Sequence, residues 1–351
     1  MKSIAIIGAG LAGITLASEL NDKGYLTKVF EKSRGKGGRA CSKRLEFAQV
    51  DTGAQYFTVR DERFLLAVES WKKQGVVNEW PFVPYVVEQL NGYSYLKESL
   101  DDISRFVGTP TMNAFVKSQA THLDIVLKTQ VNKITKQADK WQLYTGTDEL
   151  LGQFDWVIST APAEQSFELF KEHIGIQQQI PSEVHNPCWA VVLATKGKVP
   201  EQIQGVFGDD QVAWVSRDSS KPQRERLNDA IDLDDVWVMH FSEKWTKANM
   251  QMPEHEMQSF ALNWLADTLN NTMLLNPKQF ASTEKVKLTL SSAYRHFWRY
   301  ARFNDDNSNL NDIVFDRENQ VAVIGDWCFG GRVENAFLSG IECAEQLMME
   351  L

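Results

Sequence analysis

The sequence predicts an α/β fold in which a domain built on a parallel sheet is interleaved with a second domain of antiparallel strands and helices. Three observations lead to this prediction. Residues 4–31 read as strand, glycine-rich turn, helix and strand. The stretches after residue 60 contain many short strands and proline-punctuated turns. At 351 residues the chain is long for one hydrophobic core, which favours two domains.

The first strand–helix–strand unit carries a dinucleotide-binding pattern. An apolar strand over 4–7 leads into a G-x-G-x-x-G motif, formed by Gly8, Gly10 and Gly13. Gly8 permits the tight turn, Gly10 lets the backbone approach a pyrophosphate, and Gly13 lets helix and strand pack closely. The helix amides that follow favour phosphate charge, and Glu31, at the end of the second strand, can accept hydrogen bonds from a ribose. The pattern predicts a Rossmann-type domain that binds the ADP half of NAD or FAD.

A second glycine-rich loop, Ser33–Arg39, follows Glu31 directly. Its glycines permit close approach to the pyrophosphate from the other side. Arg34, Lys36 or Arg39 can offset phosphate charge. The alternative is a flexible surface turn.

The motifs GAGLAG, EKSRGKGGR and DTGAQYFTVR (51–60) together resemble the flavin amine oxidase superfamily. HFWRYA (296–301) and VIGDWCFGGRVENAFLSGIECAEQL (323–347) agree, so the resemblance spans nearly the whole chain. Within the superfamily the sequence is most similar to the renalase-like oxidoreductases. The resemblance implies an FAD cofactor and the two-domain architecture of p-hydroxybenzoate hydroxylase and the amine oxidases.

Carried over from the superfamily motifs, the implied cofactor contacts fall in six segments. They are Gly8, Gly10, Leu11, Ala12 and Gly13; Glu31, Lys32, Gly38 and Arg39; Gly53, Ala54 and Gln55; Val131; Thr160 and Ala161; and Gly325, Asp326, Arg332, Val333, Glu334 and Asn335. In the family, residues matching 53–55 pass the isoalloxazine ring, the position matching Val131 meets the adenine, and the amides matching 333–335 lie beside the flavin pyrimidine. A helix N-terminus there would stabilise the negative charge of reduced flavin. A plain C-terminal surface helix is the alternative.

The remaining elements follow in order. Helices are predicted over 63–74, 113–121, 254–269 and 332–347, and strands over 124–127, 131–135, 141–145, 154–162, 189–195, 236–241 and 321–324. Asn91-Gly92 is a hairpin signal, and residues 304–316 read as a loop. We assign 1–60, 99–162 and 289–351 to the FAD-binding domain, and 61–98 and 163–288 to the substrate domain.

Composition excludes several classes of function. A net charge of -9 and a pI near 5.3 argue against a nucleic-acid or anionic-membrane partner. The longest apolar runs are shorter than a membrane span, and no signal sequence precedes the first strand. The four scattered cysteines indicate neither a disulfide framework nor a zinc site, and no other metal-ligand cluster is visible. We expect a cytoplasmic protein with reduced thiols and no metal.

A bound flavin would supply the redox chemistry, so the protein has to place a hydride donor and exclude side reactions. The candidates for the substrate cavity are His240, Arg299 and Tyr300. Each has an ordinary structural alternative: a packed sheet histidine, an ion-paired arginine and a core aromatic residue. Cys328 suggests a thioether link to flavin, but its neighbourhood departs from the superfamily attachment motifs, so we expect non-covalent FAD.

Three functions remain open. By its resemblance to renalase-like enzymes, the protein would oxidise isomers of dihydro-NAD(P) that carry the hydride at an abnormal ring position, with O2 as acceptor and hydrogen peroxide as product. A dihydropyridine needs no general base, which fits the lack of an acid–base pair in the sequence. The alternatives are an amine oxidase, and a desaturase-type or non-catalytic flavoprotein that shares the fold.

Overall fold

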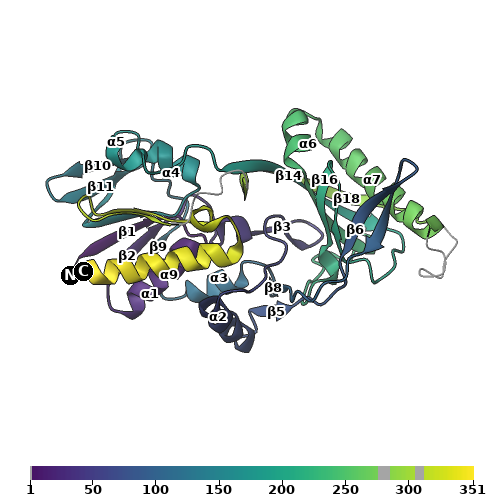
Figure 1. Ribbon diagram of the computed structural model, residues 1–351, viewed down its shortest axis with the longest axis horizontal. Coiled ribbons are helices and arrows are strands. Elements are labelled where there is room, and N and C mark those ends of the chain that lie inside the picture. Colours follow the sequence, from purple (N-terminus) through teal and green to yellow (C-terminus); the bar gives the residue numbers. More distant parts are fainter. Residues whose placement is uncertain (1, 276–284, 305–311) are drawn as a thin grey trace.

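The computed structural model describes residues 2–275, 285–304 and 312–351. Two bodies lie side by side along the long axis of the molecule, and both chain ends lie at the far end of one of them (Figure 1). Strand β14 (His185–Lys196) reaches from one body into the other. Among the described residues, every helix is too short or too polar to span a bilayer.

The first body contains a six-stranded sheet with the order β19-β20-β13-β1-β2-β9. Its strands are β1 (Ser3–Ile7), β2 (Leu26–Phe30), β9 (Ile125–Val126), β13 (Trp156–Ser159), β19 (Val314–Asp316) and β20 (Val321–Val323). All neighbours are parallel except β19, which pairs antiparallel with β20. The predicted loop over 304–316 is therefore wrong at 314–316, where apolar residues form an edge strand; residues 305–311 lie outside the described residues.

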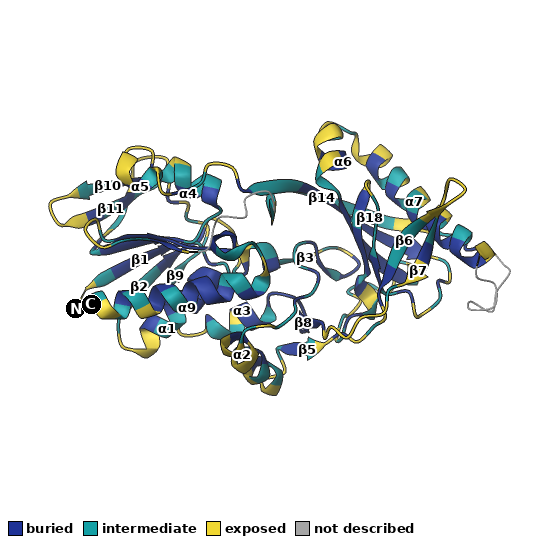
Figure 2. Ribbon diagram, in the orientation of Figure 1, coloured by how far each residue is buried: buried dark blue, intermediate teal, exposed yellow. Residues whose placement is uncertain are grey.

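Helices cover both faces of this sheet (Figure 1). One face carries α1 (Leu11–Asp22), α3 (Ala114–Gln119) and α9 (Val333–Glu350). Gly340 permits α9 to approach α1 closely, because a Cβ there would lie 2.7 Å from the Ala12 carbonyl oxygen. Much of α9 is therefore buried (Figure 2). The other face carries α4 (Ala163–Leu169), α5 (Ile174–Gln177) and a small sheet of β10 (Lys133–Gln137), β11 (Lys140–Tyr144) and β12 (Leu150–Phe154).

The second body contains a seven-stranded sheet with the order β18-β14-β17-β16-β15-β6-β7. The strands besides β14 are β6 (Tyr85–Leu90), β7 (Tyr93–Glu98), β15 (Gly205–Phe207), β16 (Val212–Arg217), β17 (Asp235–Phe241) and β18 (Thr289–Phe303). Only β15 and β6 pair in parallel. The helices α6 (Glu243–Ala248) and α7 (Glu254–Leu275) cover its outer face, where β17 contributes Trp237, Met239 and Phe241 to a second core.

The remaining elements are shorter or lie outside the two large sheets. They are β3 (Ser42–Arg44), β4 (Gln49–Asp51), β5 (Val77–Glu79), β8 (Phe106–Gly108), α2 (Glu62–Lys73) and the 3-10 helices Gly38–Ala40, Asp218–Ser220 and Asp326–Phe329. Strand β3 pairs with β4, and β5 pairs with β8.

The structure groups three segments differently from the predicted domain boundaries. Residues 289–303 form β18, which pairs with β14 in the seven-stranded sheet, although the sequence prediction assigned them to the FAD-binding domain. Helix α2 and the segment of α4 and α5, assigned to the substrate domain, bury Phe64, Trp71, Phe170 and Ile176 in the core of the first body. Partners far away in the sequence decide where these elements pack, so local patterns did not reveal it.

Candidate active site

The turn between β1 and α1 is shaped by contacts that exclude side chains. Gly8 has φ +115°, and a Cβ on Gly13 would lie 2.2 Å from the Gly8 carbonyl oxygen. Thr160, at the end of β13, donates its hydroxyl to the carbonyls of Ile7 and Gly8, each at 3.1 Å. A Cβ on Gly10 would meet nothing within 4 Å. The turn is thus closed on its inner side and open at Gly10, where a ligand can approach the backbone.

Glu31 fixes the two glycine-rich loops to each other. Its buried carboxylate accepts hydrogen bonds from the Ala9 amide at 2.8 Å and the Ser33 amide at 2.7 Å. The Gly37 amide also donates to the Ala9 carbonyl at 2.8 Å. Each carboxylate oxygen can accept a second hydrogen bond, so the capacity to hold a ribose remains. Lys32, by contrast, donates to the Gln165 side chain at 3.0 Å.

Two further predicted contacts lie at the carboxyl edge of the same sheet. Ala161 follows Thr160, whose amide donates to the Ile7 carbonyl. Val131 is buried, and it lies two residues after Thr129, whose amide donates to the Glu31 carbonyl at 2.9 Å. The structure therefore brings Thr160, Ala161 and Val131 to the edge that carries Gly8 and Glu31, the usual ligand side of a parallel sheet.

The C-terminal motif, residues 323–347, also contributes to the region around the two glycine-rich loops. Arg39 and the buried Asp326 form an ion pair. Helix α9 then begins at Val333, and its N-cap residue Arg332 makes no side-chain capping hydrogen bond. Gly10, the N-cap residue of α1, makes none either. Two helix N-termini therefore keep backbone amides that can bind an anionic or electron-rich ligand group.

Two side chains near the start of α9 hold neighbouring backbone. Glu334 is buried, and one of its oxygens accepts from the amides of Arg60 at 2.7 Å and Asp61 at 2.8 Å. Asn335 donates its amide to the Phe329 carbonyl. A Cβ on Gly325 would lie 2.6 Å from the Trp327 indole nitrogen. These contacts fix the approach of the chain to α9.

The segment Asp51–Gln55 lies between the basic loop and the seven-stranded sheet. A Cβ on Gly53 would lie 1.9 Å from the Arg39 carbonyl oxygen, and the Ala54 amide donates to that oxygen at 2.9 Å. On the other side, the Thr52 carbonyl accepts from His240 Nε2 at 3.0 Å and from Trp298 Nε1 at 2.9 Å. The predicted flavin contacts 53–55 are thereby held from both bodies.

The sheet face that meets this segment is aromatic and imidazole-rich. In the strand register, Ala190 on β14 lies opposite both His240 on β17 and His296 on β18, and Trp214 on β16 lies opposite His240. Directly opposed residues share a face, so these four side chains form a row across the sheet. Trp298 lies on the same face, with its ring centroid 4.5 Å from that of His296.

Both histidines of this row are neutral at neutral pH. Burial, with a smaller effect of the Arg302 charge, lowers the pKa of His240 to about 3. Burial, followed by the Lys43 charge, lowers the pKa of His296 to about 4. Because a carbonyl can only accept, His240 carries its proton on Nε2. Of this row only His296 is partly exposed, and neither histidine is poised to take up a proton.

Comparison with known proteins identifies the family. Residues 85–348, more than half of the chain, match the family described as flavin containing amine oxidoreductase. The chain belongs to that family. Residues 6–66 also match the NAD(P)-binding Rossmann-like domain. The protein is therefore an FAD-dependent oxidoreductase of mixed α/β fold.

Solved structures share the fold of this flavin amine oxidoreductase along its whole length. One described as a protoporphyrinogen oxidase from Exiguobacterium sp. 255-15 matches 100% of this chain and 99% of its own, with TM-score 0.72 and 10% identity. Cyclohexylamine oxidase from Brevibacterium oxydans IH-35A matches 99% of each chain, with TM-score 0.72 and 12% identity. At such identities the likeness concerns the fold alone.

A curated relative matches over a short segment. A 1-hydroxycarotenoid 3,4-desaturase from Flavobacterium sp. (strain P99-3) is 41% identical over 59 residues, which are 17% of this chain and 12% of the desaturase. The match therefore covers a small part of the length of that relative. The substrates named for the three proteins differ, so the fold does not determine the substrate.

The residues present fit the flavin dinucleotide that the family implies. The turn is open at Gly10, and two helix N-termini lack side-chain caps at the same edge. Glycines also occupy positions where a Cβ would collide with backbone, at Gly13 and Gly53. Backbone that is free of side chains at Gly10, beside helix amides, suits an anionic group such as a pyrophosphate.

The predicted cavity residues of this flavin amine oxidoreductase are only partly brought together. Tyr300 lies on the same face of β18 as Trp298, with its ring 6.3 Å from that of His185. Arg299 is exposed and alternates to the opposite face, so the structure does not support its placement beside His240. The sequence patterns did not single out Trp214; its place in the alternating run 212–217 could have indicated a residue facing the site.

Among the described residues, no group of three histidine, cysteine or carboxylate side chains is arranged to hold a metal ion.

Proposed function

We propose that this flavin amine oxidoreductase binds FAD non-covalently and oxidises isomers of dihydro-NAD(P) that carry the hydride at an abnormal ring position, with O2 as acceptor. The observation that carries the proposal is the face of His240 and His296, both held neutral beside the Thr52–Gln55 segment. A dihydropyridine gives up a hydride without losing a proton first, so it needs no general base.

The proposed cofactor contacts follow the open edge of the six-stranded sheet. The ADP half would lie along the turn at Gly10, with Glu31 at a ribose and Val131 at the adenine. The isoalloxazine ring would lie between the 53–55 segment and the start of α9. The Cys328 thiol is fully buried, and burial raises its pKa well above the ordinary value, which supports non-covalent binding because thioether formation requires a reactive thiolate.

Bound FAD would accept the hydride, leaving NAD(P)+, and would then pass two electrons to O2, which takes up two protons and leaves as hydrogen peroxide. The chain's own residues position the reactants. His240 and Trp298 hold the Thr52 carbonyl, which fixes the loop on one side of the substrate space. The partly exposed rings of His296 and Trp298 offer a planar surface for a nicotinamide ring.

One observation favours an amine oxidase instead. Trp298 supplies a partly exposed aromatic ring on the face that meets the Thr52–Gln55 segment, and an amine can pack against such a ring. An amine reacts as the free base, so its oxidation accelerates as the pH rises toward the pKa of the substrate. A neutral dihydropyridine shows no such dependence.

The test is anaerobic reduction of the purified flavoprotein, followed by flavin absorbance between pH 6 and 8. The donors are a mixture of dihydro-NAD isomers, normal NADH and a panel of amines. We expect rapid bleaching by the isomer mixture alone, a nearly pH-independent rate, and hydrogen peroxide once air is admitted. Bleaching by an amine, with a rate that rises with pH, would make the protein an amine oxidase. Failure of the apoprotein to bind FAD would overturn the whole assignment.

A further inference from the structure

Four charged side chains are buried together at the Asp51–Gln55 segment, which contributes Asp51. The exposed fractions of the side chains of Asp51, Asp218, Lys221 and Arg224 are 0%, 2%, 0% and 4%. Lys221 Nζ lies 2.7 Å from an Asp218 oxygen and 3.4 Å from an Asp51 oxygen. Arg224 forms a second ion pair with Asp51. Two cations and two carboxylates therefore balance each other inside the protein.

This cluster is connected directly to Gln55. Lys221 Nζ donates to Gln55 Oε1 at 3.1 Å, and Ser216 donates its hydroxyl to the same oxygen at 2.6 Å. The amide nitrogen of Gln55 then donates to the carbonyls of Asp51 and, at 2.9 Å, Gly53. Two donors on the oxygen leave one orientation for the amide, with its nitrogen toward the loop.

The ammonium group of Lys221 is saturated by this arrangement. It has three protons, and its three partners are Asp218, Asp51 and Gln55. Two of the partners neutralise charge, whereas the third is a neutral amide whose other end holds the backbone of the predicted flavin segment. A buried ion pair alone is weak evidence for a contribution to stability, so the bond to Gln55 is the informative one.

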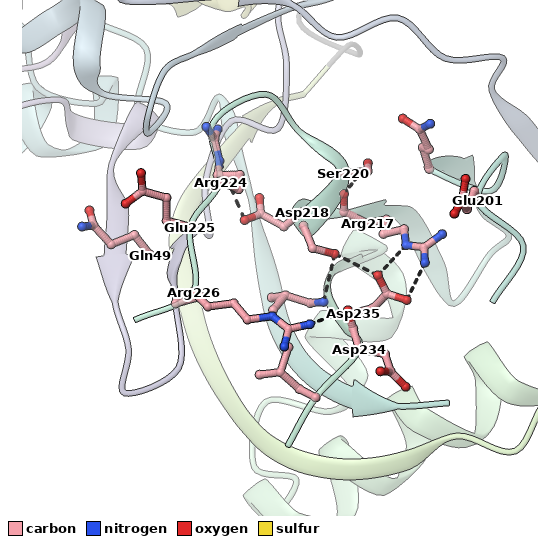
Figure 3. Close-up of a pocket in the computed structure, with 15 residues that line it drawn as sticks. Gln49, Glu201, Arg217, Asp218, Ser220, Arg224, Glu225, Arg226, Asp234 and Asp235 are labelled. Atoms are coloured by element: carbon pink, nitrogen blue, oxygen red, sulfur yellow. Dashed lines mark hydrogen bonds and ion pairs between the residues drawn. The ribbon is translucent and has the colours of Figure 1, made fainter. Parts of the chain in front are cut away.

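On its solvent side the cluster borders a polar cavity of about 400 Å³. Asp218 and Arg224 line this cavity, together with Arg217 and Asp235, which face each other (Figure 3). Arg217 bonds both oxygens of Asp235 at 2.6 Å and, at 3.1 Å, the Pro200 carbonyl. Arg217 is therefore a largely buried, ion-paired cation of the same region whose hydrogen bonds do not reach the flavin segment, and it serves as the matched control.

We propose that Lys221 is a positioning residue for the flavin: through Gln55 it holds residues 51–55 in the geometry that receives the isoalloxazine ring. The proposal rests on the proposed function, since that assigns 53–55 as flavin contacts. It adds a residue that lies outside the cofactor motifs, on the loop after β16, and acts without touching the cofactor.

The test compares Lys221→Met with Arg217→Met. Each purified apoprotein is titrated with FAD, and the dissociation constant, the absorbance bands of bound FAD and the thermal unfolding of the apoprotein are measured. We expect both variants to be less stable than wild type. Only Lys221→Met should weaken FAD binding, by about tenfold or more, and shift the flavin bands, because one lost hydrogen bond of this kind corresponds to about a tenfold change.

A double-mutant cycle tests the route through Gln55. In a Gln55→Leu background, Lys221→Met should have a much smaller effect on FAD affinity and on the flavin bands than in the wild type, with only the contact to Asp51 left to lose within residues 51–55. If Lys221→Met does not fold, Ser216→Ala removes the other donor to Gln55 Oε1 and should shift the same bands in the same direction. Equal FAD binding by Lys221→Met and Arg217→Met, or additive effects in the cycle, would overturn the positioning role. A wild-type protein that does not bind FAD would instead overturn the proposed function.

Discussion

Two positions of the N-terminal turn, Gly13 and Gly10, favour glycine for different physical reasons. At Gly13 the excluding atom belongs to the protein, since a Cβ would lie 2.2 Å from the Gly8 carbonyl oxygen. At Gly10 a Cβ would have no protein atom within 4 Å, and the backbone, with φ −75°, is one that alanine adopts readily. The protein itself therefore does not require glycine at position 10, and we propose that a ligand approaching the backbone does.

Alanine substitutions separate these two roles. Gly13→Ala should lower the free energy of unfolding of the apoprotein by about 1–3 kcal/mol, because backbone has to move to admit the methyl group. Gly10→Ala should leave the unfolding of the apoprotein unchanged and weaken FAD binding by about tenfold or more, because the methyl group occupies the approach of the pyrophosphate. Urea unfolding and FAD titration of both apoproteins are the measurements. Equal destabilisation of the apoprotein by the two changes would contradict this distinction.

Local residue chemistry could be predicted from the sequence where it depends on neighbours in the chain. The glycine motif and Glu31 are examples, since strand, turn and acid lie within 28 residues of one another in one unit. Lys221 could not be found in this way. It precedes Pro222 in a hydrophilic stretch that resembles a surface loop, and its burial depends on Asp51, which lies 170 positions away.

At the scale of elements, the junction of α2 and α9 depends on one carboxylate. Glu334, in the first turn of α9, accepts both backbone amides that lead into α2, from Arg60 and Asp61. The negative charge also lies at a helix N-terminus, where it is stabilising. One side chain thus fixes the start of α9 against the residues that lead into α2.

Replacing this carboxylate should destabilise the protein in proportion to the hydrogen bonds lost. Glu334→Ala leaves two partly buried amides without their acceptor and should lower the free energy of unfolding by about 1–3 kcal/mol. Glu334→Gln keeps an accepting oxygen and should lose less than half of that amount. Urea unfolding at neutral pH measures both. If the glutamine variant were as unstable as the alanine variant, charge rather than hydrogen bonding would hold the junction.

Element types were predictable where the local pattern is strong. Asn91 and Gly92 have φ values of 50° and 82°, and they join β6 to β7, as the hairpin signal predicts. The predicted helix over 254–269 is present and continues to Leu275. The sheet to which an element belongs was less predictable. Strand β18 contains the motif HFWRYA just before the C-terminal region that we propose binds the cofactor, yet its hydrogen bonds run to β14.

At the scale of the whole molecule, the proposed cofactor site collects segments from both ends of the chain. Arg39 and Asp326, which are 287 positions apart, form an ion pair at its centre. Binding of a ligand along residues 8–13, 53–55 and 325–335 therefore opposes unfolding of the entire first body.

FAD should accordingly stabilise the apoprotein strongly. At a free concentration of about 100 times its dissociation constant, FAD should add about 2.7 kcal/mol to the free energy of unfolding, and the thermal midpoint should rise with concentration. Riboflavin, which lacks the ADP half, should have much less effect at the same concentration. Thermal unfolding of the apoprotein with each compound is the measurement. Equal stabilisation by riboflavin would show that the Gly8–Gly13 turn does not hold the ADP half.

The strand order of the six-stranded sheet affects how the protein can fold during its synthesis on the ribosome. Strand β13 (156–159) is flanked by β1, which is made before it, and by β20, whose residues 321–323 are made long after it. In the seven-stranded sheet, β14 likewise cannot pair with β18 until residues 289–303 have been made. Each sheet therefore exposes an unpaired strand edge until β20 or β18 has been made. The nascent chain therefore depends on shielding during synthesis more than a protein whose domains emerge one after the other.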